Sequence, residues 1–175
     1  MIMLNTLKTL LGFILSVLEK YTPLRLSGNT LENTYNYLKI SDQLATSGQP
    51  TEAQFQLIQA AGYQTVINLA PVSVLENSLK TEAALLSELG MQYVHIPVDF
   101  THPTEQDFTD FVAAIQEAAE QKIWVHCAAN MRVSVFIYRY RCTVLGENQQ
   151  VAHKALQQIW EPVGVWKRFT AAHTH

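Results

Sequence analysis

Apolar side chains recur at alternating spacings of three and four near the start of the chain. The positions that follow this spacing are Leu4, Leu7, Leu11, Ile14, Leu18 and Tyr21. Polar residues fill much of the opposite face, so the pattern predicts an amphipathic helix, which we assign to an N-terminal appendage over residues 1–25. Its longest uncharged run is too short to span a bilayer. Three roles stay open: packing on its own domain or on a second copy, attachment to a membrane surface, or a signal peptide.

From Tyr35 onward, short apolar segments alternate with segments of helical periodicity. The apolar segments predict strands over residues 37–40, 44–47, 65–69, 91–96 and 123–125. Helices are predicted over residues 50–61, 76–89, 104–121, 133–145, 149–160 and 163–172. Helices between strands imply crossover connections, so we expect an α/β domain over residues 35–175 with a mainly parallel sheet flanked by helices.

Composition narrows the classes of function. The chain has 175 residues, 48% apolar and 15% charged, which suits one folded domain with a sizeable core. Its net charge of −3 argues against a nucleic-acid binder, so any anion must be bound by local backbone amides and one or two cations. Cys127 and Cys142 form no CxxC pair, and His95 and His102 lack a third ligand. We therefore expect no metal and no cofactor.

Cys127 is the candidate nucleophile, because it lies at the end of the last predicted strand and just before a helix. A helix N-terminus offers unpaired N–H groups and a positive dipole end, which favour a thiolate and attract an anion. Arg132 adds a planar guanidinium that can bind two oxygens of a tetrahedral anion. Together these groups fit attack on a phosphate ester through a cysteinyl-phosphate intermediate. The loop residues that would surround the anion are Ala128, Ala129, Asn130, Met131 and Val133.

Several segments between Tyr37 and Trp166 resemble the protein-tyrosine and dual-specificity phosphatases, and more closely the small bacterial phosphatase-like proteins of that superfamily. They are Ser47–Pro50, Val66–Leu69, Tyr93–Asp99, Val125–Cys127 and Ser134. The resemblance implies that Asp99 is the general acid, and that Ser134 donates a hydroxyl to the sulfur. It also implies a buried, orienting role for His126. Asp107 and Glu105 are alternatives for the acid.

The loop departs from the family in the spacing of its cysteine and arginine. The family places five residues between them, whereas four separate Cys127 from Arg132. One alignment deletes a loop residue and keeps Arg132 in the arginine role. An ungapped alignment preserves the spacing to Ser134, places Asn130 where glycine is usual and puts Val133 at the arginine position. We favour the ungapped alignment, because asparagine tolerates a left-handed backbone.

Three functions follow as hypotheses. The first is a cysteine-dependent phosphatase that hydrolyses phosphomonoesters, either on a phosphoprotein or on a small molecule. The second is a weakly active or inactive module of the same fold that binds an anion or a phosphorylated ligand. The third is a rhodanese-like sulfurtransferase, whose loop also has four residues between cysteine and arginine but usually carries glycine and more cations. We expect a cytoplasmic protein, either free or peripheral at a membrane through residues 1–20.

Overall fold

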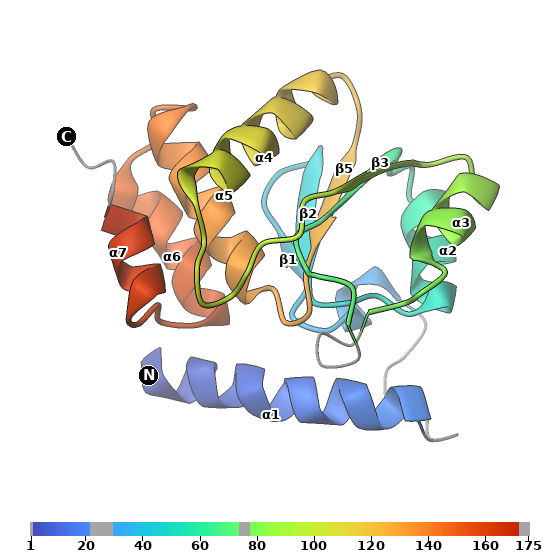
Figure 1. Ribbon diagram of the computed structural model, residues 1–175, viewed down its shortest axis with the longest axis horizontal. Coiled ribbons are helices and arrows are strands. Elements are labelled where there is room, and N and C mark those ends of the chain that lie inside the picture. The colour runs from blue at the N-terminus through green and yellow to red at the C-terminus, as the bar shows by residue number, and fades with distance from the viewer. Residues whose placement is uncertain (1, 22–29, 74–77, 172–175) are drawn as a thin grey trace.

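The computed structural model describes residues 2–21, 30–73 and 78–171, and its centre is a five-stranded sheet (Figure 1). The strands are β1 (Leu38–Lys39), β2 (Leu44–Ser47), β3 (Thr65–Asn68), β4 (Gln92–His95) and β5 (Ile123–His126), in the order β1-β2-β5-β3-β4. β1 pairs antiparallel with β2, and the other three pairings are parallel. The predicted α/β fold with a mainly parallel sheet is confirmed.

Alternate residues of the central strand β5 supply two separate cores. Trp124 packs into one core with residues of α2 (Glu52–Ala60) and α3 (Glu82–Glu88). Ile123 and Val125 point to the other face, which is covered by α4 (Glu105–Glu117), α5 (Met131–Thr143), α6 (Gln149–Ile159) and α7 (Val165–Ala171). All four residues of β5 are buried, as expected for a strand covered by helices on both faces. The site-bearing strand is therefore the innermost part of the domain.

Two helix starts follow from local sequence. Thr51 and Thr104 cap α2 and α4, and each forms a capping box with the residue three positions on. The N-cap turn predicted at Thr104 is confirmed. These caps satisfy backbone N–H groups that the first helical turn leaves without partners.

The helix predicted over residues 76–89 is shorter than expected, because α3 begins only at Glu82. Residues 74–77 lie outside the described residues. Before α3, the Ser78 hydroxyl donates to the Pro71 carbonyl, and the Ser78 N–H donates to the Ser73 carbonyl. This turn uses the groups that a longer helix would need, so apolar periodicity alone placed the start too early.

The C-terminal half packs through aromatic side chains around α5. Trp160 and Trp166 are buried and their ring centroids lie 6.4 Å apart, which confirms the packing role that the sequence suggested. α5 begins at Met131, two residues before the predicted start, so Arg132 belongs to its first turn.

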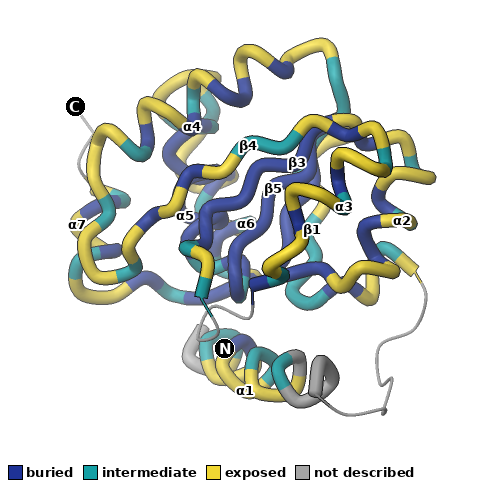
Figure 2. The backbone as a smooth tube through the Cα atoms, turned by 45° about the vertical axis from the view of Figure 1, so that its right-hand side comes forward, coloured by how far each residue is buried: buried dark blue, intermediate teal, exposed yellow. Residues whose placement is uncertain are grey.

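The predicted N-terminal helix is present as α1 (Ile2–Tyr21), and it lies beside the domain below the sheet (Figure 1). It contacts α6 and the segment after the short 3-10 helix η1 (Leu31–Asn33). Thr9 is buried in this contact, whereas Leu7 and Leu11 are exposed. The helix therefore meets the domain with polar side chains, and Figure 2 shows its exposed outer side.

Candidate active site

The loop between β5 and α5 has the form of an anion-binding turn. It runs from Cys127 to Asn130, which is the N-cap of α5 and has a left-handed backbone with φ 63°. The Asn130 carbonyl accepts the Ser134 N–H at 2.9 Å, which is the first turn of the helix. N–H groups in a first helical turn have no intrahelical acceptor, and the helix dipole places partial positive charge there. The backbone from Ala128 to Val133 thus curves around the end of a helix suited to an anion.

Two asparagines hold this loop in place. The Asn130 side chain donates to the Asn36 carbonyl at 2.8 Å and to the Thr46 hydroxyl at 2.9 Å. The Asn36 side chain in turn donates to the Ala129 carbonyl at 3.0 Å, and Asn36 is also left-handed, with φ 50°. Asparagine at position 130 therefore supplies both a tolerated left-handed backbone and two side-chain bonds that glycine would lack.

The loop also packs closely on the segment that follows β2. The Gln49 N–H donates to the Ala128 carbonyl at 3.1 Å. A Cβ on Gly48 would lie 2.9 Å from that carbonyl oxygen and 2.5 Å from the Tyr35 ring. Glycine is required at position 48 because any larger residue would push the loop away.

Cys127 and Arg132 are both buried beside this loop. Cys127 is fully buried within the larger core, and Arg132 is 3% exposed. The Arg132 guanidinium carbon lies 5.1 Å from the centroid of the Phe100 ring, a cation–π contact. Since Phe100 follows Asp99 in the chain, this contact holds the arginine next to the loop that carries the predicted acid.

Asp99 itself is exposed and makes its bonds within its own loop. Its carboxylate accepts the Thr101 N–H at 2.7 Å and the Thr101 hydroxyl at 2.8 Å, and His102 Nδ1 lies 3.8 Å away. These hydrogen bonds, chiefly from Thr101, hold the pKa of Asp99 below its ordinary value. In this arrangement Asp99 is a carboxylate rather than a proton donor at neutral pH.

The other predicted groups have structural partners. The Ser134 hydroxyl donates to the Met131 carbonyl at 2.9 Å and accepts the Trp160 indole N–H at 3.2 Å. Glu105 binds Arg139 through two bonds of 3.2 and 2.7 Å, and Asp107 completes the cap of α4. The two alternative acids thus stabilise α4 and its contact with α5.

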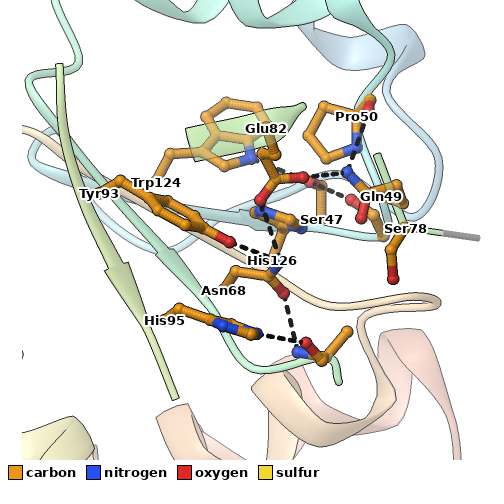
Figure 3. Close-up of polar contacts among 12 residues, drawn as sticks. Ser47, Gln49, Pro50, Asn68, Ser78, Glu82, Tyr93, His95, Trp124 and His126 are labelled. Carbon is orange, nitrogen blue, oxygen red and sulfur yellow. Dashed lines mark hydrogen bonds and ion pairs between the residues drawn. The ribbon is translucent and has the colours of Figure 1, made fainter. Parts of the chain in front are cut away.

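A buried polar network lies under the loop, at the carboxyl ends of the strands (Figure 3). Ser47, His126 and Asn68 occupy matching positions on β2, β5 and β3. Glu82, the first residue of α3, reaches into this row. Its carboxylate accepts from Asn68 Nδ2 at 2.9 Å and from Gln49 Nε2 at 2.6 Å, and it lies 3.0 Å from His126 Nε2.

The charge state of Glu82 follows from these partners. Burial works to raise the pKa of Glu82, but the His126 imidazole and the hydrogen bonds together outweigh it, so the pKa is lowered. Glu82 is therefore an ionised carboxylate enclosed in the protein, one position of the chain away from none of the catalytic candidates but bonded directly to the residue before Cys127.

Sequence reasoning identified His126 as buried and orienting, and the structure gives it that environment. It missed Glu82, Gln49 and Asn68 as parts of the site. A usable pattern was present, because three predicted strands end in polar residues, at Ser47, Asn68 and His126. Carboxyl ends of parallel strands meet at one edge of a sheet. Nothing in the local sequence indicated that Glu82 would turn inward.

The fold and the loop define a phosphatase-like α/β protein of the protein-tyrosine-phosphatase type. A family model described as DSP-PTPase phosphatase fused to NAD+ kinase matches residues 18–163, and the chain belongs to this family. The structure is similar to that of a DUF442 protein of Shewanella putrefaciens CN-32 with a provisional phosphatase assignment. The two are 31% identical with a TM-score of 0.72, over 81% of this chain and 93% of that one.

Two further similarities are more limited. TpbA of P. aeruginosa, solved in complex with pTyr, is 19% identical with a TM-score of 0.60, over 79% of this chain and 82% of that one. This likeness shows the fold alone. A beta-lactamase hydrolase-like protein of Xylella fastidiosa (strain Temecula1) is 35% identical over 95 residues. That match covers 53% of this chain and 22% of its relative, so the chain corresponds to a minor part of that protein.

Proposed function

We propose that this chain hydrolyses phosphomonoesters with Cys127 as the nucleophile. The observation that carries the proposal is the loop from Cys127 to Asn130, which ends in a left-handed N-cap and has Arg132 in the next turn. This arrangement brings a thiol, a helix N-terminus and a guanidinium together. Membership of the phosphatase family supports the same chemistry.

The reaction would run in two steps. The Cys127 thiolate attacks phosphorus, an S–P bond forms, and the bond to the leaving oxygen breaks as that oxygen takes a proton. Water then attacks phosphorus, the S–P bond breaks, and inorganic phosphate and the thiolate are released. Arg132 and the loop amides would stabilise the charge on the equatorial oxygens. Asp99 would supply the proton and then accept one from water, provided that its loop moves toward the substrate.

The substrate would be a phosphoprotein or a small phosphate ester. The complex of TpbA with pTyr supports a phosphate monoester as ligand for this fold. Because Cys127 is fully buried, an ester can reach its sulfur only after the side chains that cover it move aside.

Hydrolysis of p-nitrophenyl phosphate by four purified proteins tests the proposal. We expect turnover by the wild type, a loss of roughly 10⁴-fold or more for Cys127→Ser, and a loss of about 10²-fold for Asp99→Asn. Cys142→Ser is the matched control, since this half-buried cysteine lies far along α5, and it should retain wild-type turnover. Equal turnover by wild type and Cys127→Ser would contradict the proposal.

A second candidate is a phosphate-binding module without turnover. It is favoured by one observation: Asp99 is exposed, bonded to Thr101 and ionised, so it is not poised as an acid. Isothermal titration with tungstate separates the two. Tight binding by a wild-type protein that hydrolyses no p-nitrophenyl phosphate between pH 5 and 8 would establish the module, and turnover would exclude it.

A further inference from the structure

One side of α1 exposes a continuous group of large apolar side chains, which we call the α1 apolar face. Each of its members is between 45% and 62% exposed. They lie along one side of a helix because their spacings are three and four residues. The members are Leu4, Leu7, Leu10, Leu11, Ile14 and Leu15.

The opposite side of α1 is fixed to the domain by polar groups. The Thr9 hydroxyl donates to the Ile159 carbonyl at 2.5 Å, and the Asn5 side chain donates to the Gln157 carbonyl at 3.0 Å. The Glu161 N–H donates to the Thr6 hydroxyl at 3.1 Å. These bonds determine which side of the helix meets the domain.

The Tyr35 ring completes this contact. Its hydroxyl donates to the Thr9 carbonyl, and the ring lies so close to Gly12 that a Cβ there would be 2.6 Å from it. A helix seated on its domain through threonine, asparagine and glycine cannot turn its leucines inward without losing those bonds. The apolar face is therefore left for a surface outside this chain.

We propose that a second copy of this chain covers the α1 apolar face, through the same helix. Leu4, Leu7, Leu11 and Ile14 repeat with the alternating three- and four-residue spacing of a coiled-coil seam. Leu10 and Leu15 lie beside the seam and widen it. A two-fold arrangement lets one apolar face serve both partners, so no second surface is needed.

Charge favours a second copy over a membrane. A helix that lies on a membrane usually presents lysine and arginine on its polar side, where headgroups are found. The polar side of α1 is occupied by the domain, and Lys8 is the single charged residue among the α1 side chains that the structure describes. The net charge of −3 adds repulsion from an anionic leaflet. Within the described residues, no helix is long and apolar enough to cross a bilayer.

Sedimentation of the full chain over a range of concentrations tests the proposal. We expect a wild-type dimer, and a dissociation constant raised by at least about 100-fold in Leu7→Glu/Leu11→Glu, which places charges in the seam. Leu7→Gln/Leu11→Gln is a second variant that keeps helix propensity without adding charge and should weaken the dimer in the same direction. Leu145→Glu is the matched control, because Leu145 is 59% exposed beyond the end of α5. It should sediment as the wild type does.

Three results would overturn the proposal. They are a monomeric wild type at every concentration, a dimer that persists in both double variants, and a monomer that co-sediments with vesicles of phosphatidylethanolamine and phosphatidylglycerol. Near-ultraviolet circular dichroism verifies that each variant keeps its packed core. The dimer is independent of turnover, so failure of either proposal leaves the other standing.

Discussion

The two sides of the β5–α5 loop are built in opposite ways. Below the loop, Glu82 is buried and bonded to residues from three other elements of the chain, including His126 directly before the nucleophile. On the other side, Asp99 is exposed and its carboxylate bonds stay within two residues of its own position, at Thr101. One side is a fixed support, and the other is a surface loop.

This difference separates binding from proton transfer. Groups that stabilise charge work best when they are held in place before the substrate arrives, because no reorganisation is then needed during reaction. A general acid on a loop can instead be brought in by loop closure. We infer that anion binding depends on the buried support, and that turnover depends on movement of the Asp99 loop.

The largest effect is expected for the cation beside the loop. Arg132→Ala should weaken tungstate binding by about 100-fold, because a charge-assisted, two-pronged contact is lost from a buried site. Arg132→Lys keeps the charge without the fork and should recover part of the loss. Isothermal titration measures both. Unchanged affinity in Arg132→Ala would remove the arginine from the anion site.

The buried support should make the next largest contribution, which is to stability. Glu82→Gln should lower the free energy of unfolding by about 2 kcal/mol at neutral pH, because bonds to a buried charge are lost. Urea denaturation measures this value. Glu88→Gln, in the same helix but exposed, is the control and should change stability little.

The same pair of proteins gives a pH test with a defined sign. The pKa of Glu82 is lowered by folding, so its stabilisation is present above the ordinary glutamate pKa and is lost as pH falls through the folded value. The stability difference between wild type and Glu82→Gln should therefore shrink in acid. A constant difference across that range would show that Glu82 is not ionised in the folded protein.

A smaller effect distinguishes the two roles of Asn130. Asn130→Gly removes the side-chain bonds but keeps the left-handed backbone accessible, whereas Asn130→Ala removes the bonds and adds strain. Alanine should cost about 1 kcal/mol more than glycine, measured by urea denaturation. Equal stability of the two variants would mean that only the bonds to Asn36 and Thr46 matter.

The smallest effect is expected on the exposed side. Asp99→Asn should leave tungstate affinity within about twofold of wild type, since an exposed carboxylate is well screened by solvent. Titration at neutral pH measures this. A large change in affinity would place Asp99 among the binding groups and remove the contrast between the two sides.

Local patterns predicted most of the fold, and part of the site. The five strands, the cap at Thr104 and the position of Cys127 before a helix all follow from nearby residues. The left-handed backbone at Asn130 was also expected, because few other residues tolerate it. The early start assigned to α3 was wrong, since a turn through Ser78 competes with the helix.

What the sequence by itself determined are the features that depend on neighbours along the chain: periodicity, caps, and the thiol and guanidinium placed at one helix end. Only the tertiary structure decided that Glu82 pairs with His126, and that α1 turns its threonines inward and its leucines out. Both outcomes depend on partners far away in the chain. A buried carboxylate needs a partner from another element, and a helix face is chosen by the surface that it meets.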